Sequence, residues 1–351
     1  MSARWPLLVV LAFASSFLSA QQHMQVGSSV PLPEIWNRMD YARSSCGVDG
    51  DFIALLPGGV AELPHQLVHI AANGAMLGHF DLHRTPGFEN GAINGLALDA
   101  AGKSVLLVRN VASTKITKTD DEGRPRGAVF RFDHNSWVVT VDDKGQVLNK
   151  FSFDERVVVP LGFALFRSGN VLVLRQIHQG QHGELIAPGA VIFSPAGVML
   201  VNLNLPISPR KWPAARDAVA QLHLLPGAAD EVFVAHFGTE PYLLKVSADG
   251  TVGPKVMLAV PEDERAFVQK IAGHRAMAFI GQAKLPAPGT ISKAPEWKPE
   301  AVFDTESGAL LDTLLVPQHE LGPVCYSESG MTFIRTPEGT LDSLVPKPVA
   351  Q

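Results

Sequence analysis

Long apolar runs, basic clusters and aromatic residues are all scarce in this chain of 351 residues. Charged residues make up 18% of the sequence and aromatic residues 7%, and the formal net charge is −5. No run of Lys or Arg is interleaved with aromatic residues, so we expect no nucleic-acid or anionic-membrane partner. Beyond the first 20 residues no stretch is long and apolar enough to cross a bilayer, which takes about 20 residues.

The sequence also lacks the motifs of nucleophilic and phosphate-binding enzymes. There is no Gly-x-Ser-x-Gly turn that would expose a serine, and neither cysteine lies beside a histidine. Pro57–Gly59 and Gly91–Gly95 are rich in glycine but lack the lysine of a phosphate loop. These absences favour a binding protein, and the question of an enzyme stays open.

Histidines recur at a spacing that metal sites use on helices, where residues four apart share one face. The three pairs are His65/His69, His79/His83 and His178/His182. On a strand such residues are about 13 Å apart, whereas a zinc ion needs nitrogen ligands at about 2 Å. The first two pairs fall in strand patterns, so we predict no metal and no cofactor. Local chelation by the third pair with Glu184 stays open.

The first 20 residues have the pattern of a targeting segment. Arg4 supplies positive charge, Leu7–Leu18 is apolar, and Ala20 is a small residue before Gln21. Because the apolar run is short for a membrane span, we predict a cleaved signal peptide and export to the periplasm or the medium. We expect no membrane insertion after cleavage, and an uncleaved anchor is the alternative.

Glycine and proline are abundant, with 31 and 26 residues, and they separate short apolar runs. A strand, a glycine-centred turn and a second strand recur along the chain. The inner pairs of this kind are Gly47–Leu56, Asn94–Arg109, Leu161–Arg175, Leu222–His236, Ile271–Gly281 and Val324–Arg335. The outer pairs are Leu67–Leu82, Val138–Phe153, Val191–Leu205, Leu243–Val260 and Val302–Val316. Six inner pairs interleaved with five outer pairs predict an all-β, six-bladed β-propeller with four-stranded blades.

The last repeat supplies three strands but no fourth. We expect residues Gln25–Pro31 to complete this blade, because an unpaired sheet edge would invite aggregation. The domains are then a signal peptide (1–20), an N-terminal segment with the ring-closing strand (21–45), the propeller (46–346) and a tail (347–351). Short helices are predicted at Pro33–Ala42, Pro213–Gln221 and Pro261–Gln269.

The two cysteines each lie at the start of an inner strand pair. Cys46 belongs to the first repeat and Cys325 to the last, and these repeats are neighbours in a closed ring. A disulfide between them would lock the ring in an oxidising compartment. Two buried free thiols are the alternative.

Two repeats resemble those of a known family. Ile93–Val108 reads INGLALDAAGKSVLLV and Gly162–Leu174 reads GFALFRSGNVLVL. Both resemble repeats of the NHL and SMP-30-like six-bladed propellers, of the TolB-like superfamily, and the resemblance implies that fold but little about activity. SMP-30-like hydrolases hold a divalent metal with an early Glu plus Asn and Asp residues. Asn94 could match one ligand, but near the first inner strand the chain offers Cys46 and Asp49 and no Glu.

The ends of the inner strand pairs carry several cations. In alignment these ends read Leu56, Arg109, Arg175, His236, Gly281 and Arg335. Equivalent positions lie at similar height around a propeller channel, and guanidinium groups bind carboxylate or phosphate through two parallel hydrogen bonds. We therefore predict a ligand site at the channel mouth, formed by Asn94, Arg109, Asn110, Arg175, His178, His236, Gln282 and Arg335. In the alternative, each arginine pairs locally with an acid such as Asp217 or Glu89.

The favoured function is an exported propeller that binds a small anionic molecule or an acidic peptide, with no catalytic residue. One alternative is a hydrolase or lactonase of SMP-30-like type that uses a divalent metal. Another is a protein-interaction platform, built on the charged extension Val111–Asn135 or on the proline-rich excursion Ala283–Pro299.

Overall fold

Strands account for nearly all the regular structure in the computed structural model, as the period-two sequence pattern predicts. The structure describes residues 21–33, 43–47, 49–56, 66–86, 88, 91–119, 125–153, 160–179, 185–208, 210–211, 221–238, 240–282, 296–318, 320–327, 330–335 and 339–347. The predicted signal peptide and all but one end residue of the helices predicted at Pro33–Ala42 and Pro213–Gln221 lie outside them. So does most of Ala283–Pro299.

Four sheets are antiparallel meanders that follow one another along the chain. The first contains β2 (Arg43–Cys46), β3 (Phe52–Leu56), β4 (Gln66–Ile70) and β5 (Met76–Asp81). The second contains β6 (Gly91–Leu98), β7 (Ser104–Thr119), β8 (Pro125–Val141) and β9 (Val147–Ser152). The third contains β10 (Pro160–Leu165), β11 (Val171–Gln179), β12 (Leu185–Phe193) and β13 (Met199–Asn204), with β14 (Arg210–Lys211) paired to β12. The fourth contains β15 (Leu222–Pro226), β16 (Glu231–His236), β17 (Tyr242–Ser247) and β18 (Val252–Met257).

The remaining strands form one eight-stranded sheet that β1 (Gln21–Pro31) holds together. On one side lie β19 (Glu264–Ala272), β20 (Arg275–Gln282), β21 (Trp297–Asp304) and β22 (Leu310–Pro317). On the other lie β25 (Thr340–Pro346), β24 (Gly330–Arg335) and β23 (Glu320–Ser327). Residues 21–23 of β1 pair in parallel with β22, and residues 24–31 pair antiparallel with β25. The predicted pairing of Gln25–Pro31 with the last repeat is therefore confirmed.

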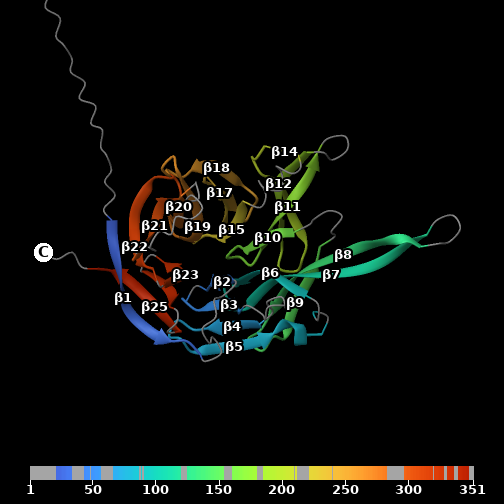
Figure 1. Ribbon diagram of the computed structural model, residues 1–351, viewed down its shortest axis with the longest axis horizontal. Coiled ribbons are helices and arrows are strands. Elements are labelled where there is room, and N and C mark those ends of the chain that lie inside the picture. The colour runs from blue at the N-terminus through green and yellow to red at the C-terminus, as the bar shows by residue number, and fades with distance from the viewer. Residues whose placement is uncertain are drawn as a thin grey trace, which may run out of the picture.

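The number of separate sheets differs from the prediction. Six separate four-stranded sheets are predicted, but five sheets form, because β1 joins the last two meanders into one sheet of eight strands. The sheets are arranged around a common centre, as in a β-propeller (Figure 1).

The apolar core is divided among the interfaces between neighbouring meanders. The described residues form six buried clusters, each of which joins two meanders that are adjacent in the chain or, in the last case, at its two ends. Ile53 of the first meander packs with Leu106 of the second. Phe52, the neighbour of Ile53, points to the other face of β3 and packs with Val324 of β23. The first and last meanders therefore meet, and the ring is closed.

The turn between the two outer strands of a meander packs against the preceding meander, as the second meander shows. Asp142 accepts hydrogen bonds from the backbone N–H groups of Lys144 and Gln146, at 2.9 and 2.8 Å, and Gly145 has a φ of 77°, which favours glycine. A Cβ atom on Gly145 would come within 2.9 Å of the Phe80 ring in the preceding sheet. The tight turn thus lets two meanders pack closely.

The turn of the first meander makes the equivalent contact with β1. A Cβ atom on Gly74 would come within 2.8 Å of the Pro31 carbonyl oxygen and 3.1 Å of the Val30 side chain. The first meander therefore sits on the N-terminal strand as the second sits on the first. This contact is a second closure of the ring, at its outer edge.

Two further sequence predictions can be compared with the strands. The helix predicted at Pro261–Gln269 is wrong: β19 begins at Glu264, because Ala266 and Val268 alternate into the core and pair with β20. The hairpin extension predicted at Val111–Asn135 is present, since β7 and β8 stay paired far beyond the sheet (Figure 1).

Candidate functional site

The first strands of the meanders enclose a cavity of about 500 Å³ at the centre of the ring. Its wall comes from β2, β6, β10, β15, β19 and β23, so every meander contributes. The contributing segments, such as Leu96–Ala100 and Leu224–Ala228, run into the first turn of each meander. The cavity therefore lies toward the end of the channel where these turns gather.

Most of the cavity wall is apolar, and its charges are few. The apolar side chains include Leu96, Leu98, Phe163, Leu165, Leu225 and Met331. The charged residues among the described wall are Asp99, Arg167 and Lys270. The Asp99 carboxylate is already engaged, because its Oδ1 accepts hydrogen bonds from the backbone N–H groups of Ala101 and Lys103 at 2.9 and 2.8 Å. Two positively charged residues therefore line this mainly apolar cavity together with one carboxylate that is already hydrogen-bonded to the backbone.

Lys270 is the most perturbed cation of this wall. β19 and β20 slip in register between Val268 and Lys270, so Gln269 is the extra residue of a β-bulge. Within the described part of the chain no carboxylate forms an ion pair with Lys270. Burial therefore acts alone, and it lowers the pKa of Lys270 from 10.5 to about 8.

Two other polar residues of the wall carry atoms that lack partners. The Gln269 Oε1 and Thr332 Oγ1 atoms are buried and form no hydrogen bond with any described residue. Both residues line the cavity, as Lys270 does. Because buried polar atoms almost always have a partner, these two atoms are unusual among the described residues of the wall.

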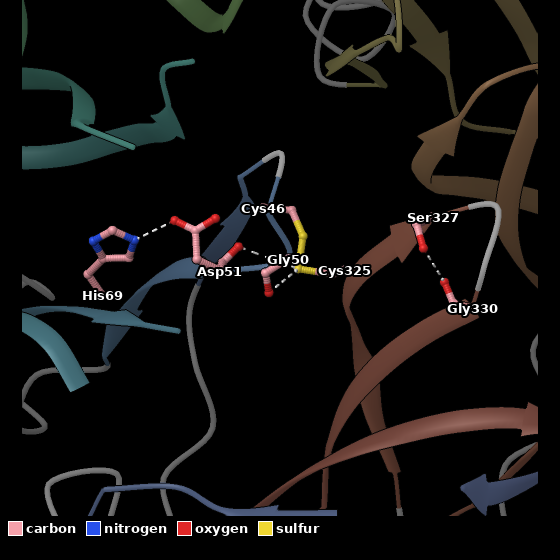
Figure 2. The surroundings of a disulfide bond; sticks show 7 residues. All are labelled: Cys46, Gly50, Asp51, His69, Cys325, Ser327 and Gly330. Carbon is pink, nitrogen blue, oxygen red and sulfur yellow. Dashed lines mark hydrogen bonds and ion pairs between the residues drawn. A yellow bond between two sulfur atoms is a disulfide. The ribbon is translucent and has the colours of Figure 1, made fainter. Parts of the chain in front are cut away.

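A disulfide forms part of the same wall. Cys46 of β2 and Cys325 of β23 are bonded, with their Cα atoms 5.4 Å apart, and both line the cavity (Figure 2). The cysteines that the sequence predicts as partners are thus joined in the structure. The bond fixes two of the six strands that shape the chamber.

Beside the disulfide, the turn between β2 and β3 is held by a buried histidine. Asp51 Oδ2 lies 2.7 Å from His69 Nε2, and Asp143 Oδ1 lies 2.9 Å from His69 Nδ1. Figure 2 shows the Asp51 side chain directed at the His69 ring, next to Gly50 and the disulfide. Since Asp143 belongs to the second sheet, this contact ties two meanders together and steadies the turn behind the cavity wall.

The predicted arginines lie between sheets rather than in the cavity. Arg109 lies two residues after Leu107 on β7, and Arg175 lies two residues after Val173 on β11. Leu107 and Val173 belong to the same core cluster. By the alternation of side chains both arginines belong to the interface of the second and third sheets. Arg175 is 8% exposed and donates from Nη2 to Asn202 Oδ1 at 2.6 Å, and burial lowers its pKa. The Arg109 Nε atom is buried without a hydrogen-bond partner among the described residues.

The other predicted site residues do not form a common site with Arg109 and Arg175 in the described part of the structure. The His236 ring stacks on Tyr242 with centroids 4.7 Å apart, and its nitrogens contact the Glu240 carbonyl and the Gln221 amide oxygen at 3.2 Å each. Asn94 is the extra residue of a bulge between β6 and β7. Neither these two residues nor Arg109 and Arg175 line the cavity. Outside the described side chains lie Asn110, His178, Gln282, Arg335, Asp217 and Glu89.

Sequence reasoning missed Lys270, Gln269 and Thr332. A single lysine in an alternating strand indicates a solvent-exposed position, and only ring closure encloses this half-buried residue. One signal was available: Gln269 and Lys270 are two consecutive polar residues that interrupt the alternation of β19, which is the pattern of a bulge.

A search of the described residues for metal sites and membrane spans finds neither. No group of three or more His, Cys, Asp or Glu residues there is arranged to hold a metal ion. No helix in the same residues is long and apolar enough to cross a membrane.

No family model matches the sequence, and neither does any curated protein. Solved structures with a similar outline include a member of the DUF4221 family from Bacteroides vulgatus, at 10% identity and a TM-score of 0.48, covering 94% of this chain and 100% of that one. A protein of unknown function from Bacteroides caccae has 10% identity and a TM-score of 0.42, with 79% and 82% covered. The major allergen Mala s 1 of Malassezia sympodialis has 11% identity and a TM-score of 0.41, with 92% and 97% covered. Membership of the NHL and SMP-30-like propellers stays a prediction.

Proposed function

We propose that this chain is an exported six-bladed β-propeller that binds a small organic anion in the channel cavity. The observation that carries the proposal is Lys270, a cation in an apolar chamber with no described carboxylate partner. A bound anion would supply the missing charge. The proposed site is therefore formed by the first strands of the meanders, and not by the arginines at the ends of the inner strand pairs.

The blade count rests on the core and not on the count of separate sheets. Six apolar clusters lie at six interfaces, so β19–β22 and β23–β25 with β1 each act as one blade. The parallel pairing of β1 with β22 covers only three residues, so it joins two blades without merging their cores. Export is supported by the disulfide, because such bonds persist in oxidising compartments.

The cavity defines the chemical class of the ligand. A volume of about 500 Å³ falls within the usual range for small-molecule sites, roughly 300 to 1,000 Å³. The wall combines leucine and phenylalanine side chains with polar residues that include Lys270, Gln269 and Thr332. A ligand with an apolar body and a single carboxylate therefore matches the wall better than a highly charged molecule such as a nucleotide.

Benzoate is the first probe of this proposal, with benzamide as a neutral molecule of the same shape. We expect isothermal titration calorimetry to show benzoate binding to the wild type at pH 7 and at least tenfold weaker binding of benzamide. Benzoate binding should weaken as the pH rises above 8, because the Lys270 charge is lost there. The expected effect of Lys270→Met is at least a tenfold loss of benzoate affinity.

Lys245→Met is the matched control, because Lys245 lies in the fourth sheet, 3.6 Å from Glu231, and does not line the cavity. It should leave benzoate binding unchanged. Equal affinity of the wild type and Lys270→Met for benzoate, or equal binding of benzoate and benzamide, would contradict the proposal.

A further inference from the structure

The chamber around Lys270 is suited to more than the binding of a charge. Lys270 lines a cavity whose wall is mainly apolar, and no described carboxylate holds its amine as an ammonium ion. A lysine whose pKa is lowered by such surroundings keeps a larger free-amine fraction near neutral pH than an exposed lysine, and the free amine is a nucleophile. The amine also has room beside it for a small molecule, which a lysine packed in a solid core does not.

We propose that Lys270 attacks the carbonyl carbon of an aldehyde or ketone bound in the channel cavity and forms an imine. This inference rests on the proposed function, since it places the ligand in the same chamber. It identifies the ligand class more narrowly, as a carbonyl compound that also carries a carboxylate, such as a 2-oxo acid.

The reaction balances without an oxidant or a reductant. The amine lone pair adds to the carbonyl carbon, the carbonyl π electrons move to oxygen, and a proton passes from nitrogen to that oxygen to give a carbinolamine. Loss of the hydroxyl group with the second amine proton, as water, forms the carbon–nitrogen double bond. The products are one imine and one water molecule, and water returns the amine by the reverse path.

Two polar residues of the same cavity wall, Thr332 and Gln269, are suited to these steps. The Thr332 hydroxyl is able to donate a hydrogen bond to the carbinolamine oxygen, and the Gln269 Oε1 atom is able to accept one from the amine or from the departing water. Both atoms are buried in the described structure without a partner. We infer that they position the carbonyl group, while Lys270 provides the reacting atom.

Reductive labelling tests the proposal inside the wild-type protein. The probe is glyoxylate, a small anionic aldehyde, with sodium cyanoborohydride to reduce each imine to a stable secondary amine. Peptide mass spectrometry then gives the labelling rate at each lysine. At pH 7 an amine with a pKa of 8 is uncharged roughly 300 times more often than one with the ordinary value of 10.5. We expect Lys270 to be labelled at least tenfold faster than Lys245, which lies outside the cavity wall.

The pH profile gives a second readout. Labelling of Lys270 should rise by roughly 50-fold between pH 6 and pH 8 and level off above pH 9, as the amine loses its proton. Benzoate affinity should change in the opposite direction over the upper part of this range. Labelling of Lys270 no faster than that of Lys245 in the folded protein would overturn the proposal, and so would a profile without a midpoint near 8.

The two proposals fail in different ways. Lys270→Arg keeps the positive charge but forms no imine, so it should bind benzoate and lose the label at position 270. If benzoate binds and depends on Lys270 but glyoxylate leaves this lysine unlabelled, imine formation is wrong and anion binding stands. If the neutral aldehyde propanal labels Lys270 selectively and benzoate does not compete, the reactive lysine stands and anion binding is wrong.

Discussion

Burial favours the uncharged form of Glu300 of β21, as it does for Lys270 of β19 in the same meander. Glu300 is 1% exposed, and burial raises its pKa from 4.5 to about 7. The positive charge of Lys298 opposes this shift only in part. The Lys298 Nζ atom donates to the Glu320 carbonyl oxygen at 2.6 Å, and Glu300 Oε2 has no hydrogen-bond partner in the described residues. A protonated Glu300 is therefore the form that the fold accommodates.

Glu300→Gln should remove a pH dependence of stability. Below pH 4.5 the Glu300 carboxyl is protonated in both the folded and the unfolded state. Between pH 4.5 and 7 only the unfolded state releases this proton. The free energy of unfolding therefore falls as the pH rises through this range. The loss amounts to at most about 3 kcal/mol and is complete above pH 7. Urea unfolding from pH 4 to 8 should show the variant more stable than the wild type above pH 7. The exposed Glu306→Gln is the control, and a variant with the wild-type pH slope would contradict the assignment.

At the scale of the strand, β1 determines how the last two blades fit together. Its Met24 side chain is 2% exposed and packs with Met277 and Phe333, which belong to the two blades that β1 joins. The next residue, Gln25, is exposed. One strand thus provides core contacts to both neighbours, and not only backbone hydrogen bonds along an edge.

Met24→Ala should lower the free energy of unfolding by about 2 to 5 kcal/mol, the usual loss when a buried methionine is truncated. Gln25→Ala is the matched control on the exposed face and should change it by less than about 0.5 kcal/mol. Urea denaturation of the two variants measures the difference. A Met24→Ala variant as stable as Gln25→Ala would show that β1 is not part of the core.

Strands were easier to predict than the cavity. Alternation and glycine turns indicate the strand pairs, because both are local patterns of sequence. The role of Gln25–Pro31 follows from counting strands, because the last repeat lacks a fourth strand. Pro261–Gln269 misleads because its local helix preference is overridden by pairing with β20. The burial of Lys270 arises only when six distant strands converge, so no window of sequence contains it.

At the scale of the whole molecule, the disulfide closes the ring across 279 residues of chain. In the chain-entropy description, a loop of this length makes the bond worth about 5.6 kcal/mol, and measured losses are typically about 2 to 5 kcal/mol. The bonded cysteines also line the channel cavity, so the bond couples the integrity of the ring to the shape of that cavity.

The double variant Cys46→Ala/Cys325→Ala should unfold at lower urea concentration, with a loss of about 2 to 5 kcal/mol. The wild type treated with dithiothreitol should match the double variant, and dithiothreitol should have no effect on the variant itself. Mass spectrometry after alkylation without reduction provides a direct check. Two alkylated thiols in the protein purified without reductant would show that the bond is not formed.

The eight-stranded sheet takes β1 from the beginning of the chain and β23–β25 from its end. During synthesis β1 leaves the ribosome before every other strand described, so it waits for its antiparallel partner β25 until the strands between them have been made. The ring therefore closes only after β25 is synthesised, and a chain that stops before it keeps an open seam.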